Sequence, residues 1–165
     1  MKRQRIAQVV LPLLIVTVIV GIWYMKNAGK KQVIPLVITE VNLDEIRSHA
    51  LPVILDFGSD SCVPCQLMAP VLEKVHAEMQ GKALIYYVDV WKYPKAVEGF
   101  PVRVIPTQVF YTADGRPYVP SEEIRTSIEF TLYYAKETNE HLFTVHEGGL
   151  TEGQMFRILA EMGVK

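Results

Sequence analysis

The only two cysteines of this chain lie three positions apart, in the stretch Cys62-Val63-Pro64-Cys65. Two thiols at this spacing can close into a small disulfide, open to a dithiol, or hold a metal ion. Two cysteines in 165 residues make no framework of structural disulfides, so the pair is either reactive or metal-binding. The flanking residues favour the disulfide and dithiol forms.

The pair lies where a predicted strand meets a predicted helix. Residues 52–57 form a short apolar run typical of a buried strand, and residues 66–79 have a helical pattern. Cys62 is therefore expected at the mouth of the helix, where unpaired N–H groups and the helix dipole lower the pKa of a thiol. Pro64 has no N–H and suits the first helical turn.

Asp56 lies in the apolar strand, six positions before Cys62. A carboxyl group buried there would have a raised pKa and could take a proton from Cys65, the thiol expected to lie deeper. Cys62 would then attack a disulfide, and Cys65 would resolve the mixed disulfide. The alternative is a strand-end aspartate in water with no part in the chemistry.

Metal and nucleic-acid binding are the weaker interpretations. The net charge of −1 and the pI near 6.4 give no reason to expect nucleic acid. His141 and His146 have a zinc-like spacing, but they are far from the cysteines in sequence and would lie on opposite faces of a strand. We therefore expect no metal site.

The N-terminus has the features of a membrane anchor. Residues 1–5 are basic, and the apolar run from Ile6 to Met25 is about long enough to cross a bilayer as a helix. Trp23 and Tyr24 stand at its far end, where aromatic side chains favour the headgroups. No small-x-small cleavage site follows, so we expect an uncleaved anchor, followed by a linker over residues 26–35.

Charge does not orient this anchor, because three cations precede the run and three follow it. We place the soluble domain outside the cytoplasmic membrane for another reason. A disulfide-active domain on a membrane tether is most useful where disulfides persist.

Residues 36–165 are predicted to form one α/β domain. Strands alternate with helices first and pair locally later, which favours a mixed sheet with helices on both faces. The expected strands are 33–38, 52–57, 83–90, 107–112, 129–134 and 141–145, with a further strand after the turn at Asp114-Gly115. The expected helices are 43–50, 66–79, 93–100 and 152–162.

Several short motifs of this chain resemble those of the thioredoxin family, and they occur in the same order as in the family. The similarity covers about Val37 to Gly163, with an insertion near 121–140. It is carried by the following residues: Asp56-Phe57 before the Cys62-x-x-Cys65 pair, Pro70 five positions after Cys65, Val88-Asp89-Val90, Ile105-Pro106-Thr107 and Gly148-Gly149-Leu150-Thr151.

The resemblance implies a thioredoxin-like fold, with Ile105-Pro106-Thr107 as the family's cis-proline loop. The backbone edge at Ile105, Pro106 and Thr107 would bind an extended substrate chain, beside Val63 and Pro64. Three positions depart from the family. Ser61 and Gly58 stand where the family has tryptophan, and Ile85 stands where it has a buried lysine.

These observations and the resemblance predict a membrane-tethered thiol–disulfide oxidoreductase. The resemblance implies that it reduces protein disulfides, because Ile105-Pro106-Thr107 and Asp56 are more similar to the reducing branch of the family than to the oxidising one. It would need no bound organic cofactor and would take electrons from a transmembrane donor. An alternative is a module that delivers copper(I) on the same two thiolates. Another is an interaction domain whose contact surface is the insertion at 121–140.

Overall fold

A computed structural model of the chain describes residues 16–22 and 33–165. Residues 16–22 are helical. The rest of the expected membrane anchor lies outside the described residues, and within them no helix is both long and apolar enough to span a bilayer. The chain from Ile34 to Lys165 forms one compact unit, which carries the cysteine pair.

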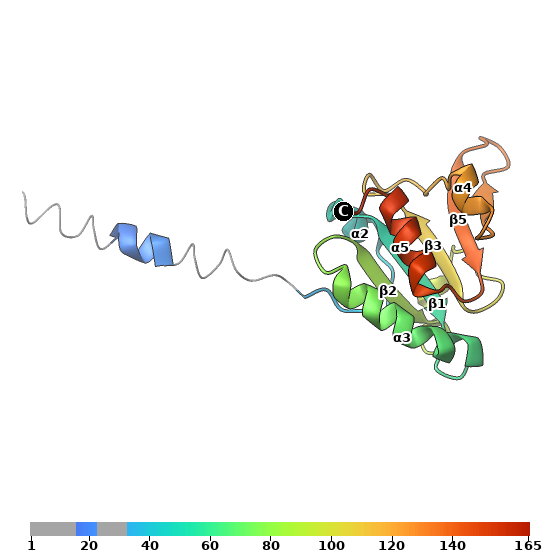
Figure 1. The fold of residues 1–165 in the computed structure, drawn as a ribbon, viewed down its shortest axis with the longest axis horizontal. Coiled ribbons are helices and arrows are strands. Elements are labelled where there is room, and N and C mark those ends of the chain that lie inside the picture. Colours follow the sequence, from blue (N-terminus) through green and yellow to red (C-terminus); the bar gives the residue numbers. More distant parts are fainter. Residues whose placement is uncertain (1–15, 23–32) are drawn as a thin grey trace, which may run out of the picture. The chain divides into compact units, whose positions relative to one another are not determined.

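The centre of this unit is a five-stranded mixed sheet, as the strand and helix pattern predicted (Figure 1). The strand order is β2-β1-β3-β5-β4. β1 and β2 run parallel, and the other neighbouring strands run antiparallel. The strands are β1 Val53–Gly58, β2 Leu84–Asp89, β3 Thr107–Tyr111, β4 Thr131–Tyr134 and β5 His141–Glu147.

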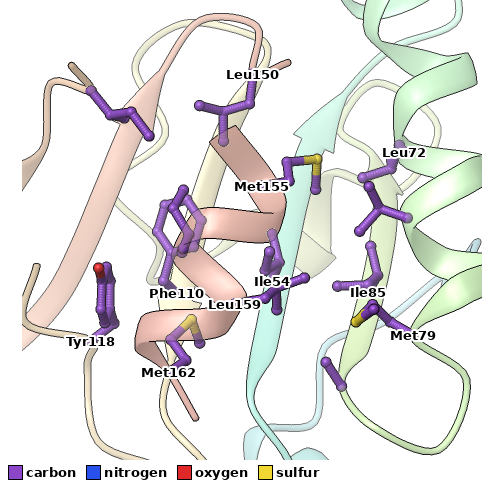
Figure 2. Close-up of a cluster of buried hydrophobic side chains, with 14 of the residues drawn as sticks. Ile54, Leu72, Met79, Ile85, Phe110, Tyr118, Leu150, Met155, Leu159 and Met162 are labelled. Carbon is purple, nitrogen blue, oxygen red and sulfur yellow. The ribbon is translucent and has the colours of Figure 1, made fainter. Parts of the chain in front are cut away.

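Helices cover both faces of the sheet, as expected. α3 (Val63–Glu78) and α5 (Glu152–Glu161) lie side by side over one face (Figure 1). The core under them joins strand residues to helix residues, among them Ile54, Ile85, Phe110, Leu72 and Leu159 (Figure 2). The other face packs against α2 (Leu43–Ser48) and the 3-10 turn η1 (Pro94–Val97).

Successive residues of β1 supply both cores, because side chains alternate across a strand. Ile54 points into the core with α3 and α5, and Leu55 points into the core with α2 and η1. Asp56 is the next residue on the Ile54 side, so the alternation places its carboxyl group under α3.

Local capping fixes where these helices begin. The Asn42 side chain accepts hydrogen bonds from the N–H groups of Asp44 and Glu45 at the start of α2. Thr151 and Gln154 form a reciprocal capping box at the start of α5. The caps at Asn42 and Thr151 agree with the predicted helix starts.

Several predicted elements differ in extent. The strand expected over 33–38 is only a bridge between Val37 and Tyr87, and Pro35 within it has no N–H to donate to a ladder. The strand expected after Asp114-Gly115 is likewise a single bridge, between Tyr111 and Pro117. The helix expected over 93–100 is reduced to η1.

The segment predicted as an insertion, residues 121–140, contains the short helix α4 (Glu122–Arg125) and the edge strand β4. β4 pairs with β5 through a turn in which Asn139 has a positive φ of 55°. Ile124 and Ile128 are buried in the core beneath α5. This segment therefore adds a strand to the sheet and apolar side chains to the core.

Candidate active site

The two cysteines form a disulfide at the start of α3. The helix begins at Val63 rather than at Gln66 as predicted, because Cys62 is its N-cap and Pro64 fits its first turn. The Cys65 N–H donates to Cys62 Sγ over 3.3 Å. Both residues are largely buried, with 9% of Cys62 and 6% of Cys65 exposed, so exposure alone barely distinguishes them.

The loop before β3 lies directly against Cys62. The Ile105–Pro106 peptide bond is cis, as the resemblance implied. The Ile105 carbonyl oxygen lies 3.7 Å from Cys62 Sγ. The Thr107 hydroxyl donates to the Val104 carbonyl over 2.7 Å, which holds the loop closed on itself. The structure thus brings Ile105, Pro106 and Thr107 to the cysteine pair.

Exposed apolar side chains lie on α3 next to the pair and on the two loops that meet at Ile105. Val63 and Leu67 are exposed on the first turns of α3. Trp91 is 63% exposed, and with Val104 and Ile105 it lines a hollow of about 340 Å³. Leu67, Trp91 and Val104 were not among the residues predicted from the sequence to line the site. Their signal was available, because Trp91 follows Val88-Asp89-Val90 and Val104 precedes Ile105-Pro106-Thr107.

Trp91 stands on a turn that Asp89 holds in place. The Asp89 side chain is buried and accepts hydrogen bonds from the N–H groups of Asp60, Trp91 and Lys92. Burial by itself would raise the pKa of Asp89, but these N–H groups and the charge of Lys92 outweigh it and lower the pKa. An ionised Asp89 therefore links the turn before Cys62 to the turn that carries Trp91.

Asp56 is buried, with only 3% of the residue exposed. Burial raises its pKa to about 7, and a hydrogen bond from Gln108 opposes that rise. Gln108 Nε2 donates to Asp56 Oδ1 over 2.7 Å. The predicted buried carboxyl group is confirmed, and the alternative of a solvated strand-end aspartate is wrong.

Asp56 and Cys65 line one cavity of about 390 Å³ behind the disulfide. Tyr87 from β2 closes one side of it, and Asp60 and Glu73 stand on its lining. A cavity of this volume has room for water, and carboxyl groups supply hydrogen-bond partners. Asp56 and Cys65 can therefore exchange a proton through water in this cavity.

Gly58 makes room for this arrangement. A Cβ atom at Gly58 would lie 2.9 Å from Tyr87 Cε2 and 3.3 Å from Cys65 Sγ. The Tyr87 ring thus occupies the space in front of β1, at the position where the family has a tryptophan in place of Gly58. A tyrosine from the neighbouring strand replaces a side chain from β1.

Ile85 is buried in the apolar core, so no cation replaces the family's lysine at this position. Gln108 is instead the polar neighbour of Asp56, and it was not among the residues predicted from the sequence. Its signal is a lone glutamine within an otherwise apolar and hydroxyl-bearing strand, Thr107–Tyr111.

The two candidate metal-ligating histidines have other partners. The His141 ring bonds the Thr144 hydroxyl and the Phe143 carbonyl, and the His146 ring bonds the Glu129 carbonyl. Within residues 16–22 and 33–165, no three His, Cys, Asp or Glu side chains come close enough together to hold a metal ion.

A helix-capping cysteine, its disulfide partner, a facing cis-proline and a buried carboxyl group define a dithiol–disulfide exchange domain. The sequence model of the thioredoxin family matches residues 34–130. The chain belongs to the thioredoxin family and is a thioredoxin-type thiol–disulfide oxidoreductase.

Bacterial thioredoxins show this similarity at the level of sequence. Thioredoxin 1 of Chlorobaculum tepidum is 35% identical over 41% of this chain and 67% of its own length. Thioredoxin of Staphylococcus saprophyticus is 33% identical over 56% of this chain and 92% of its own length. A crystal structure of chloroplastic thioredoxin z, at 22% identity and a TM-score of 0.49, covers 78% of this chain and 96% of that chain, a likeness too low to add to the assignment.

Proposed function

We propose that this chain is a membrane-tethered reductase of protein disulfides, in which Cys62 attacks, Cys65 resolves and Asp56 takes the proton of Cys65. One arrangement carries the proposal. Cys62 caps α3 against the Ile105 carbonyl, while Asp56 and Cys65 share the cavity behind it. The attacking sulfur thus faces the substrate side, and the base faces the resolving sulfur.

In the first step the Cys62 thiolate attacks one sulfur of the substrate disulfide. A Cys62–substrate disulfide forms, the substrate S–S bond breaks, and the other substrate sulfur leaves as a thiolate. The Cys65 N–H, which lies 3.3 Å from Cys62 Sγ, supports the negative charge before the attack.

In the second step Asp56 takes the proton from the Cys65 thiol, and the resulting thiolate attacks Cys62 Sγ. The Cys62–Cys65 disulfide forms, and the second substrate sulfur leaves as a thiolate. Cys62 has released its proton to water before the attack, Asp56 then passes the proton of Cys65 to water, and the two substrate thiolates take up protons from water. Overall the dithiol has lost two electrons and two protons, and the substrate has gained them. The two sulfurs of the protein carry the chemistry, so no bound organic cofactor is required.

The substrate chain would lie in extended form along the loop at Ile105, Pro106 and Thr107, where the partly exposed Ile105 offers its backbone for pairing, while Pro106 and Thr107 are buried. Val63 and Pro64 form the helix side of this surface, and both are exposed. The apolar side chains of Trp91 and Val104 flank it. Segments that carry apolar residues next to their disulfide fit this surface best.

The proposed direction is reduction of substrates, on the resemblance of Ile105-Pro106-Thr107 and Asp56 to the reducing branch of the family. The reduction potential of the Cys62–Cys65 pair tests this in the full chain. We expect a value close to the roughly −270 mV of thioredoxin. A potential close to the roughly −120 mV of DsbA would contradict reduction. The Cys62→Ser variant, with no disulfide to form, is the blank.

The proposed tether is the apolar run of residues 6–25, with the domain outside the cytoplasmic membrane and electrons supplied by a membrane carrier. Cys62 and Cys65 are the only cysteines, so a thiol reagent reports on this domain alone. In cells that express the full chain, the protein should stay with membranes through an alkaline carbonate wash. After mild reduction, a membrane-impermeant maleimide should label it in intact cells.

Release by carbonate would rule out the tether. Labelling only after the cells are permeabilised would place the domain on the cytoplasmic side. A chain with serine at both positions, Cys62→Ser and Cys65→Ser, gives the background of the labelling.

A further inference from the structure

Gln108 is a buried polar residue that the exchange mechanism does not yet use. It lies on β3 directly opposite Asp56 on β1, and its exposed fraction is 0%. Its Nε2 donates to Asp56 Oδ1 over 2.7 Å and contacts Met68 Sδ at 3.5 Å. Its Oε1 is buried and has no hydrogen-bond partner. This free acceptor therefore lies one amide rotation away from the carboxyl group of Asp56.

An unpartnered acceptor in the core is destabilising, and few such groups occur in folded proteins. The free Oε1 of Gln108 gains a possible partner when Asp56 takes up a proton. A carboxylate only accepts hydrogen bonds, whereas a carboxylic acid has one O–H to donate. A primary amide carries a donor at one end and an acceptor at the other, and rotation of its terminal torsion exchanges the two.

We propose that Gln108 is a positioning residue for the proton step. Its amide donates to the Asp56 carboxylate and, when turned over, accepts from the Asp56 carboxylic acid. Asp56 therefore keeps a hydrogen-bonded neighbour both before and after it takes the proton of Cys65. This inference rests on the proton-accepting role proposed above for Asp56.

The other titratable groups around Asp56 are acidic groups, a thiol and a neutral tyrosine. α3 contributes Cys65 and, farther along the cavity, Glu73, and the turn before the helix contributes Asp60. β2 contributes Tyr87, whose pKa is raised by burial and by the acidic groups nearby, so that it stays neutral. Among the described residues that line the cavity there is no lysine or arginine.

A cation beside Asp56 would stabilise only its carboxylate, and an apolar residue would favour only its acid. The amide of Gln108 suits both forms and offsets part of the rise in pKa that burial causes. Loss of the amide should therefore raise the pKa of Asp56 further and slow the step that needs its carboxylate.

The test is a pH titration of the Asp56 carboxyl group by ¹³C NMR in the full chain. The variant Gln108→Met keeps an unbranched side chain of similar length and removes the amide. We expect the pKa of Asp56 to be higher by about one pH unit in this variant, because a hydrogen bond to a charged group is lost. The matched control is Gln66→Met, which makes the same change on the lining of the same cavity, where the Gln66 amide bonds the Asp60 carbonyl and not Asp56.

The second readout is the rate of the resolving step against pH. In Gln108→Met its midpoint should move to higher pH by the same amount as the pKa of Asp56. In an Asp56→Asn background, Gln108→Met should not shift the midpoint of the pH–rate profile. Gln108→Asn, which withdraws the amide by one methylene, should act in the same direction and serves if Gln108→Met fails to fold.

An unchanged pKa of Asp56 in both Gln108 variants would overturn the proposal. So would a rate that falls equally at every pH, with or without Asp56, because that result indicates a structural role only. A raised pKa of Asp56 with no shift in the rate profile would overturn the proton-accepting role of Asp56 itself. That outcome is distinct, because the coupling between Gln108 and Asp56 would still be measured.

Discussion

Replacement of Cys65 by serine is expected to leave Cys62 locked to its substrates in mixed disulfides. The Cys62 thiolate still attacks, but no second thiol releases the substrate. The rate at which Cys65→Ser reduces a protein disulfide should fall to the rate of the uncatalysed reaction. Trapped partners can be released by a small thiol and identified after non-reducing electrophoresis of the full chain.

The matched control is Cys62→Ser, in which Cys65 is the remaining thiol. It should trap far less, because Cys62 is the sulfur that faces the Ile105 loop. Adding Val104→Lys to Cys65→Ser should lower the trapped yield without unfolding the chain, because Val104 is exposed beside that loop. Equal trapping by Cys62→Ser and Cys65→Ser would contradict the assignment of the attacking sulfur.

Asp56→Asn is expected to stabilise the folded chain at neutral and alkaline pH. The folded pKa of Asp56 is about 7 and its ordinary value is 3.8. Between these two pH values the folded state holds a proton that the unfolded state has already lost. The wild type should therefore lose stability as pH rises from about 4 to about 7, and level off above. The total is about 4 kcal/mol, at about 1.4 kcal/mol for each pH unit.

Urea unfolding of the oxidised full chain between pH 2 and pH 9 measures this difference. The two proteins should have similar stabilities near pH 4 and diverge as the pH rises. Asp114→Asn is the control, and it should change the free energy of unfolding in the opposite direction. Hydrogen bonds from Thr112 and Arg116 lower the pKa of Asp114 to about 2, so its contribution is present above pH 4 and is lost in acid. Parallel curves for wild type and Asp56→Asn would contradict a raised pKa at Asp56.

The gain in stability should accompany a loss in rate. Asparagine cannot take the proton from Cys65, so the resolving step of Asp56→Asn should be slower than that of the wild type near pH 8. A buried carboxyl group that destabilises the fold and speeds the reaction is the pattern expected of a functional residue rather than of a packing residue.

The sequence by itself determined the local features of this protein. The alternation in β1, the cap at Asn42 and the cysteine pair at the mouth of α3 all follow from residues that are close together in the chain. Such features depend on backbone geometry and hydrogen bonds over a few residues, which propensity and periodicity capture. The boundaries were less accurate where proline intervened, at Pro35 and at Pro64.

Only the tertiary structure decided what surrounds the reactive groups. Gln108 meets Asp56 across 52 positions of sequence, and the Ile105 carbonyl meets Cys62 across 43. The register of β1 against β3 sets the first contact, and the cis peptide bond at Pro106 stands within the loop that makes the second. β1 and β3 are far apart in sequence, so no short turn fixes their register, which depends on which faces of the two strands pack into the core. The motif therefore identified the cysteine pair, and the fold supplied the groups that surround it, Asp56 with Gln108 and the Ile105 carbonyl.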